Sequence, residues 1–310
     1  MKRVLVTGAS GFIGRHLLAP LVERGFDVHA VTHRAPLSVA CGCTWHVLDL
    51  LDTTQIAPLM RAVQPTHLLH LAWYAAPGKY WTALENFAWV QASLELLRRF
   101  HEAGGVRVVM AGTCAEYDWT YGYCSEHTTP TRPHTIYGTC KLALHSMLAA
   151  YARETHLSSA WGRIFFLYGP DEHPSRLVAS VARSLLRGEV ARCSHGNQLR
   201  DYLHVHDVAD AFAALLDSGV AGAVNIASGQ PVAVKDVIYR IGAILGRRDL
   251  IRLGAVPVGP DDPHLLCADV QRLSDDVGWW PRYDLDSGLA TTIMWWQHQL
   301  CVARRRFQAR

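Results

Sequence analysis

The first half of the chain alternates between short apolar segments rich in β-branched residues and longer segments with helical periodicity. Strands that alternate with helices in this way pair in parallel, and the helices cover both faces of the sheet. The pattern therefore predicts an α/β fold with a doubly wound parallel sheet. The predicted strands cover residues 2–8, 27–34, 44–50, 66–73 and 106–112, and the predicted helices cover residues 15–25, 53–63 and 84–103.

Three glycines follow the first predicted strand and open the first predicted helix, in the sequence VTGASGFIGRHL. In this context Gly8 allows a tight turn, Gly11 lets the backbone approach a pyrophosphate, and Gly14 lets the helix pack on the sheet. The N-terminus of the helix then faces the anionic phosphates. A glycine-rich turn without a ligand is the alternative, but the strand before it and the helix after it favour a Rossmann-type dinucleotide site.

The end of the second predicted strand bears on which dinucleotide binds. An acidic residue there would bind the ribose 2′-hydroxyl of NAD, but this strand ends with Thr32, His33 and Arg34. The guanidinium of Arg34 is well shaped for a 2′-phosphate, whereas a simply exposed side chain is the alternative. We therefore predict NADP(H) in preference to NAD(H), with Asp49 accepting a hydrogen bond from the adenine amino group.

Tyr137 and Lys141 are four residues apart in the sequence YGTCK, at the start of a segment that reads as a helix. Residues with this spacing share one helical face, so a simple surface pair is one interpretation. The other is a phenol whose pKa is lowered by a fixed positive charge. The glycine motif favours the second interpretation, because a dinucleotide site needs proton-transfer groups beside it.

The character of the sequence changes after Gly169, where helical segments mix with short strands and proline-containing loops. We predict a dinucleotide-binding Rossmann domain over residues 1–168. Residues 169–310 are predicted to form mainly a smaller substrate-binding lobe, with some segments returning to the first sheet.

Taken together, these segments resemble an extended short-chain dehydrogenase/reductase, and within that superfamily the NAD-dependent epimerase/dehydratase family that acts on nucleotide sugars. The resemblance runs through VTGASGFIGRHL, AGTCAEY, YGTCK, RIFFLYGP, QLRDYLHVHDVADA and NIASGQ. It implies that Lys141 binds the nicotinamide ribose and lowers the phenol pKa of Tyr137, which exchanges a proton with the sugar. It also implies that Thr113 holds the reacting oxygen, and that a homodimer forms through residues 84–103 and 137–153.

Departures from the family pattern limit the reaction. Sugar 4,6-dehydratases of this family carry acidic residues where this chain has Cys114 and Ala115. Glu116 is one residue out of register, so on a strand it would face the other way. Elimination of water therefore has no evident acid or base.

A second departure concerns the diphosphate of the substrate. Many relatives have an asparagine at the position of Phe166, which cannot make the amide contact. Arg200, which matches a family arginine that binds nucleotide phosphates, and Arg176 become the leading phosphate contacts. The loop of residues 73–81 is dense in aromatic residues, which suits either stacking on a sugar or base, or packing.

The expected site residues fall into three groups. The catalytic group is Thr113, Tyr137 and Lys141; the cofactor group is Gly8, Gly11, Phe12, Ile13, Gly14, Arg34, Asp49, Leu50, Leu71, Ala72 and Lys141; the substrate group is Trp73, Tyr74, Thr113, Arg176 and Arg200. No metal ion is expected. The sequence contains 17 histidines, but their spacing matches no metal-ligand motif, and His204 and His206 are predicted to alternate along a strand.

Three functions remain open. An NAD(P)H-dependent reductase of a nucleotide-activated 4-keto-6-deoxy sugar stands first, because the chain keeps Thr113, Tyr137 and Lys141, lacks the dehydratase acids and carries Arg34. A nucleotide-sugar C4 epimerase needs the same three catalytic residues and is the alternative. A non-catalytic dinucleotide-binding protein is the third, and the presence of both Tyr137 and Lys141 argues against it.

The composition excludes other classes of partner. Thirty basic and 27 acidic residues give a formal net charge of +3, which offers no electrostatic case for binding nucleic acid. The eight cysteines contain no CxxC pair, which suits reduced thiols. No apolar run approaches the ~20 residues of a membrane helix. We expect a cytoplasmic protein whose partner is a nucleotide-diphosphate sugar.

Overall fold

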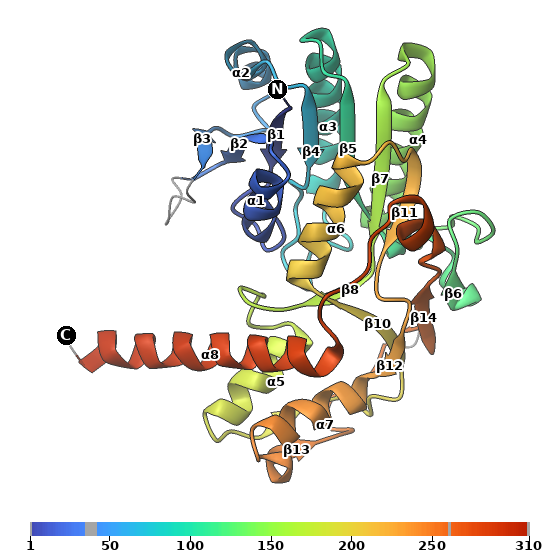
Figure 1. The fold of residues 1–310 in the computed structure, drawn as a ribbon. Helices are drawn as coiled ribbons and strands as arrows, with labels where there is room; N and C mark the ends of the chain where they lie inside the picture. Colours follow the sequence, from blue (N-terminus) through green and yellow to red (C-terminus); the bar gives the residue numbers. More distant parts are fainter. Residues whose placement is uncertain (1, 35–41, 260–261, 309–310) are drawn as a thin grey trace.

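The computed structural model describes residues 2–34, 42–259 and 262–308. Its larger lobe is built around a seven-stranded parallel sheet (Figure 1). The strand order is β11-β7-β5-β4-β1-β2-β3, and every neighbouring pair in the sheet is parallel. The predicted Rossmann-type doubly wound fold is therefore confirmed. The strands are β1 (Arg3–Thr7), β2 (Asp27–Thr32), β3 (Cys43–Val47), β4 (His67–His70), β5 (Arg107–Thr113), β7 (Ser158–Ile164) and β11 (Gly222–Ile226).

Helices cover both faces of this sheet, as the alternating pattern predicts. Successive residues of a strand point to opposite faces. Val4 and Val6 of β1 accordingly pack in one apolar cluster with α1 (Gly14–Glu23) and α6 (Val205–Asp217). Leu5 lies in a second cluster on the other face. That face is covered by α2 (Ile56–Val63), α3 (Glu85–Glu102) and α4 (Ile136–Thr155), and the 3₁₀ turn η1 (Thr53–Gln55) precedes α2.

The smaller lobe lies below the large sheet in Figure 1 and has its own apolar core. Its sheet contains β12 (Pro231–Ala233), β10 (Leu199–His204), β14 (Leu265–Ala268) and β6 (Tyr123–Cys124), with β8 (Phe166–Tyr168) paired to β10. Around it lie α5 (Leu177–Leu186), α7 (Val234–Ile244), α8 (Leu285–Gln308) and the short pair β9 (Ala191–Arg192) and β13 (Ile251–Arg252). The remaining turns are η2 (Cys114–Glu116), η3 (Trp119–Tyr121), η4 (Arg248–Leu250) and the π-helical η5 (Arg272–Asp276).

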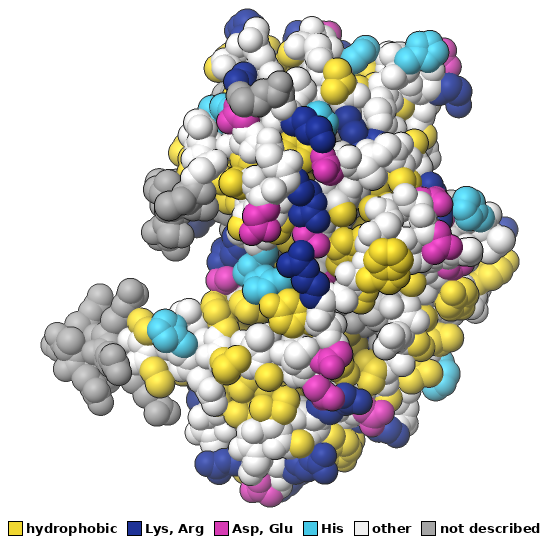
Figure 2. All heavy atoms as spheres, in the orientation of Figure 1, with side chains coloured by type: hydrophobic (Ala, Val, Ile, Leu, Met, Phe, Trp, Pro, Cys, Tyr) yellow, Lys and Arg dark blue, Asp and Glu magenta, His cyan; other side chains and the backbone are white. Residues whose placement is uncertain are grey.

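Two segments of the second half join the large sheet. β11 is its edge strand, and α6 packs against α1 on one face. The chain therefore crosses between the two lobes more than once, and the domain boundary at residue 168 stays a prediction. On the face shown in Figure 2, basic and acidic side chains are interspersed. An ion pair at 2.8 Å joins Arg24, the residue after α1, to Asp210 of α6.

The structure corrects one element of the sequence analysis. β10 ends at His204 and α6 begins at Val205, so His206 lies on a helix and the two histidines do not alternate along a strand. Their rings lie 4.9 Å apart, centre to centre. Among the described residues no three His, Cys, Asp or Glu side chains gather in the manner of metal ligands. None of the helices in the described ranges combines the length and the apolar character needed to cross a membrane.

Candidate functional site

A cavity of about 1050 Å³ lies at the carboxyl ends of the strands of the large sheet. Ligands of open α/β sheets bind at this edge. Its walls come from the loops after β1, β2, β4 and β5 and, on the opposite side, from β8, β10 and the loop before α5. The volume is at the upper end of the roughly 300–1,000 Å³ typical of small-molecule sites.

The loop between β1 and α1 forms one end of the cavity and is held in a tight turn. Gly8 has φ +70°, and a Cβ there would lie 2.7 Å from the backbone nitrogen of Ala72. The amide of Gly11 donates to the Gly8 carbonyl oxygen at 2.9 Å, and a Cβ on Gly14 would overlap that same oxygen. The chain therefore needs glycine at these positions to bring the N-terminus of α1 to the cavity. This cradle of backbone amides fits a dinucleotide diphosphate.

Most of the predicted cofactor residues line this cavity. They are Gly8, Gly11, Phe12, Ile13, Gly14, Asp49, Leu50, Leu71, Ala72 and Lys141. The sequence analysis did not include Ser10, whose hydroxyl lies 2.9 Å from the Thr32 hydroxyl, or His33, which also lines the cavity.

Arg34 is placed differently from the other predicted cofactor residues. It is exposed at the end of β2, and it is not among the described residues that line the cavity. The residues that follow it, 35–41, lie outside the described ranges. A contact between Arg34 and a 2′-phosphate stays a prediction.

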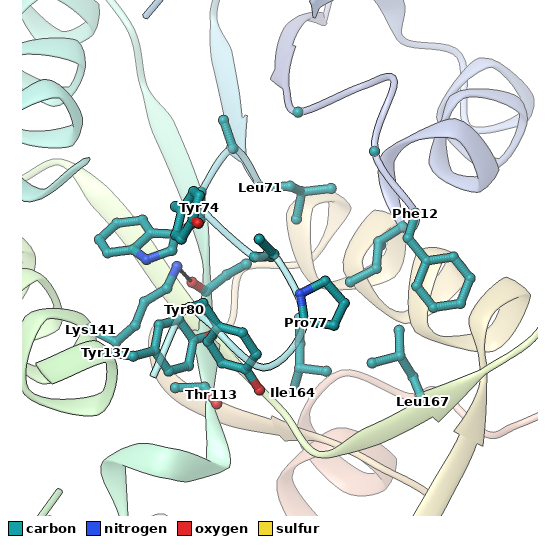
Figure 3. A pocket seen from close by; sticks show the side chains of 18 of the residues that line it. Phe12, Leu71, Tyr74, Pro77, Tyr80, Thr113, Tyr137, Lys141, Ile164 and Leu167 are labelled. Atoms are coloured by element: carbon teal, nitrogen blue, oxygen red, sulfur yellow. Dashed lines mark hydrogen bonds between the residues drawn. The ribbon is translucent and has the colours of Figure 1, made fainter. Parts of the chain in front are cut away.

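Thr113, Tyr137 and Lys141 all line the cavity and lie close to one another (Figure 3). Thr113 ends β5, and the other two lie on successive turns of α4. The helix begins there because the Thr135 side chain accepts a hydrogen bond from the Gly138 amide at 3.0 Å, which caps its first turn. The spacing in the sequence predicted that Tyr137 and Lys141 share a helical face, and the family resemblance implied that Thr113 joins them.

The electrostatics of the pair differ from the prediction. Burial raises the pKa of Tyr137 above its ordinary value, the nearby Tyr80 adds to the rise, and Thr113 opposes it. The Lys141 ammonium donates instead to the Ala111 carbonyl oxygen at 2.8 Å and lies 3.7 Å from the centre of a Trp73 ring. Burial lowers the pKa of Lys141 to about 7, although the charge of Glu116 opposes this. In the protein alone the pKa of Tyr137 is therefore raised and not lowered, whereas the effect of Lys141 on the phenol, with the lysine at the nicotinamide ribose, stays a prediction.

Glu116 is hydrogen-bonded to the Thr113 backbone in a fully buried network. It belongs to the 3₁₀ turn η2 and not to a strand, so the reason given for its orientation was wrong. One carboxylate oxygen accepts from the Thr113 amide at 2.8 Å, and the other accepts from the Arg163 Nε at 2.9 Å. Trp161 donates to both. Glu116 therefore fixes the backbone of Thr113, and the T-x-x-E spacing of a capping box was the signal that could have revealed it.

The aromatic loop of residues 73–81 packs over Tyr137. The rings of Tyr80 and Trp81 both meet the Tyr137 ring edge-on, with centres 4.9 and 5.7 Å apart. The Tyr137 amide donates to the Trp81 carbonyl oxygen at 3.1 Å. Trp73 and Tyr74 line the cavity, so the loop both packs on the phenol and forms a wall of the site.

The substrate end of the cavity contains both predicted arginines. Arg200 is almost fully buried, pairs with Asp262 at 2.6 Å and lies 5.4 Å from the centre of the Phe166 ring. Arg176 is exposed and lies 5.7 Å from the centre of the Tyr80 ring. Sequence reasoning missed Asp262, because nothing local connects it to a residue 62 positions earlier.

A Rossmann-type sheet whose glycine turn opens into a cavity lined by Tyr137 and by the buried Thr113 and Lys141 defines a dinucleotide-binding α/β protein. The chain belongs to the NAD dependent epimerase/dehydratase family, whose model matches residues 4–227. It is 27% identical over 315 residues to UDP-glucuronic acid decarboxylase 1 of Xenopus tropicalis, covering 96% of this chain and 73% of the relative. Other relatives are named dTDP-glucose 4,6-dehydratase and UDP-glucose 4-epimerase.

Solved structures agree with the fold and the family. MoeE5, in complex with UDP-glucuronic acid and NAD, is 33% identical with a TM-score of 0.83, covering 96% of this chain and 99% of its own. The UDP-glucose 4-epimerase of Thermus thermophilus, in complex with NAD, is 27% identical with a TM-score of 0.82 and covers 95% and 99% of the two chains. The relatives thus include nucleotide-sugar epimerases, decarboxylases and dehydratases.

Proposed function

We propose that this protein is a nucleotide-sugar 4-epimerase that oxidises and reduces C4 of the sugar in a nucleotide-diphosphate sugar. The observation that carries the proposal is one continuous cavity lined by Thr113, Tyr137 and Lys141. The glycine turn lies at one end and Arg200 at the other. A dinucleotide and a nucleotide sugar could therefore meet at the phenol. The complex of MoeE5 with UDP-glucuronic acid and NAD supports the pairing of ligands.

The side chains of the catalytic group would divide the proton chemistry among them. A bound nicotinamide would accept a hydride from C4 and return it. Tyr137 would take the proton of the 4-hydroxyl and give it back, and Thr113 would hold that oxygen. Because burial raises the pKa of Tyr137, the phenol is a proton donor in the protein alone. It becomes a base only if Lys141 leaves the Ala111 carbonyl oxygen and brings its charge closer.

The order of the candidate functions changes from that suggested by the sequence. The reductase was placed first because of the intact catalytic group, the missing dehydratase acids and Arg34. Only Arg34 separates it from the epimerase, and Arg34 is exposed and is not among the described residues lining the cavity. Relatives that share most of their length with this chain are named 4-epimerases, one of them in complex with NAD. We therefore place the epimerase first. The 4-ketoreductase stays second, because no carboxylate ends β2.

Dehydration is not proposed. Cys114 lines the cavity, but burial raises the pKa of its thiol, which keeps it protonated and unable to act as a base. Ala115 has no group that could transfer a proton.

The test follows the sugar and the cofactor separately. The purified protein is incubated with UDP-glucose, UDP-glucuronic acid or dTDP-glucose and a trace of NAD, and the C4 configuration is followed by NMR. Interconversion of C4 epimers with no net change in NADH is the expected result. A second incubation supplies C4-deuterated NADPH and 4-keto-6-deoxy nucleotide sugars. Deuterium at sugar C4, with one NADPH consumed per product, would establish the reductase instead, and no reaction in either would refute both.

We further propose that two copies pair through α3 and α4. These helices pack against each other, and large apolar side chains on each remain exposed, Phe87 at 59% and Met147 at 38%. Sedimentation should show a dimer that dissociates in Phe87→Glu. A wild-type protein that is monomeric and active would refute the pairing.

A further inference from the structure

Glu172 is a buried carboxyl group that the proposed chemistry does not use. It lies in the loop between β8 and α5 and lines the same cavity as Tyr137. Only 5% of the residue is exposed, and within the described part of the chain no hydrogen bond reaches its Oε2 atom. Leaving a buried polar atom without a partner costs free energy. A carboxyl group that faces a ligand cavity can recover this free energy when the ligand supplies the partner.

The surroundings restrict what that partner can be. Burial raises the pKa of Glu172 to about 8, and the charge of Arg176 opposes the rise. Within the described residues no salt bridge reaches the carboxyl group, so Arg176 and Glu172 do not form a closed ion pair. An aromatic wall of Tyr202 and Phe166, with ring centres 5.9 Å apart, continues the cavity.

The ligand group follows by elimination. A cationic group would be repelled by the guanidinium of Arg176, and an anionic group would be repelled by Glu172 whenever it ionises. A hydroxyl group suits both states, because it donates to a carboxylate and accepts from a carboxylic acid. Sugar rings also present apolar faces to aromatic side chains such as those of this wall.

We propose that Glu172 is a specificity-determining residue that hydrogen-bonds a hydroxyl group of the nucleotide-sugar substrate. The inference rests on the proposed function, since it takes the occupant of the cavity to be a nucleotide sugar. The ribose and the hexose both offer this chemistry. The experiment therefore has to separate them.

The experiment measures binding by calorimetry, so that it does not depend on turnover. Wild type, Glu172→Leu and Glu172→Gln are titrated with UDP, 2′-deoxy-UDP, 3′-deoxy-UDP, UDP-glucose and UDP-xylose, which lacks the hydroxymethyl group. Glu189→Gln, an exposed position just after α5, is the matched control. Glu172→Leu should weaken the ligand that carries the contacted hydroxyl about 5- to 30-fold, the loss of roughly one buried hydrogen bond. Glu172→Gln, which keeps a donor and an acceptor, should retain most of the affinity.

The deoxy ligands identify the hydroxyl. If the ribose supplies the hydroxyl, the wild type should bind one of the two deoxy-UDP ligands more weakly than UDP, by the factor that Glu172→Leu loses for UDP. Glu172→Leu and the wild type should then bind that deoxy-UDP with equal affinity. If the hexose supplies it, UDP should be unaffected and UDP-glucose weakened. Glu172→Leu removes the unpartnered oxygen but also the hydrogen bond from the Ala179 amide in the first turn of α5, so its unfolding temperature is measured beside the titrations.

Two results would overturn the inference. Equal affinities of the wild type and Glu172→Leu for every ligand would show that the carboxyl group makes no contact. An equal loss for all ligands, including NAD, would show a structural role. A wild-type protein that binds neither UDP nor UDP-glucose would refute the proposed function as well.

Discussion

The two ends of the cavity are built in different ways. The cofactor end is made by backbone within one contiguous stretch, residues 8–14, where close packing demands glycine. The substrate end is made by side chains from distant parts of the chain, as in the pair of Arg200 and Asp262 and in the loop that carries Glu172. The two ends therefore differ in which existing contacts have to change before a ligand can bind. The turn is already closed by its own hydrogen bond from the Gly11 amide to the Gly8 carbonyl oxygen, whereas Arg200 has to share or release Asp262 before it can bind a phosphate.

The largest expected effect is at the phenol between the two ends. Tyr137→Phe should lower kcat about 10²- to 10⁴-fold, the range typical of a lost general acid or base. The ring should keep its place, because the rings of Tyr80 and Trp81 pack against it with centres 4.9 and 5.7 Å away, and phenylalanine keeps these ring contacts. Cofactor affinity, measured by fluorescence titration, should change less than about twofold.

Tyr151→Phe is the matched control for this variant. Tyr151 lies on the same helix, and its hydroxyl lies 3.0 Å from His101 Nδ1, away from the cavity. Its kcat should stay within about twofold of the wild type. A Tyr137→Phe enzyme that behaves like Tyr151→Phe would remove Tyr137 from the proton transfer.

The next effect tests whether the cofactor end depends on close packing. In Gly14→Ala the new methyl group would overlap the Gly8 carbonyl oxygen, so α1 or the turn has to move. Overpacking of this kind costs about 1–3 kcal/mol. We expect thermal unfolding at a lower temperature and clearly weaker dinucleotide binding, with UDP binding at the other end retained.

Gly219→Ala is its control, because a Cβ at that position meets no heavy atom within 4 Å. It should keep both stability and dinucleotide affinity. If Gly14→Ala lost UDP binding as strongly as dinucleotide binding, the two ends would not be independent.

The same contrast explains what the sequence could reveal. The glycine turn and the i, i+4 pair of Tyr137 and Lys141 are local, so their spacing predicted both the elements and their position at the strand ends. The partners of the charged groups are not local. Lys141 contacts the Ala111 carbonyl oxygen and a Trp73 ring, and Glu116 contacts Arg163, only after segments 30 or more residues apart have folded together. The upward shift of the Tyr137 pKa could not be read from the sequence for this reason, since it depends on burial and not on spacing.

A smaller effect concerns Arg34, whose side chain would add a contact to the cofactor end of the cavity. If Arg34 pairs with a 2′-phosphate, Arg34→Ala should weaken NADPH about tenfold or more, the value of one charge-assisted hydrogen bond, and leave NADH unchanged. Arg61→Ala, which removes an exposed arginine of α2, should affect neither cofactor. Equal affinities of the wild type for NADPH and NADH would show that Arg34 does not select the cofactor.

The smallest expected effect is a proton taken up when the cofactor end is filled. Burial lowers the pKa of Lys141 from its ordinary 10.5 to about 7. Between these values the unfolded chain binds one proton more at this residue than the folded protein does. The contribution of Lys141 to the free energy of unfolding therefore increases as the pH rises through this window. An anionic dinucleotide beside the ammonium favours its charged form and raises its pKa. Binding should thus take up a fraction of a proton, approaching one, in the same window.

Calorimetry at about pH 8.5, in two buffers of different ionisation enthalpy, measures this uptake directly. Lys141→Met keeps an apolar side chain of similar length against Trp73 and has no proton to gain. In that variant the uptake should vanish, and the rise of stability between about pH 7 and 10 should flatten. Unchanged uptake in Lys141→Met would assign the proton to another group. It would also mean that the dinucleotide leaves the ammonium at the Ala111 carbonyl oxygen, where it cannot help Tyr137 to act as a base.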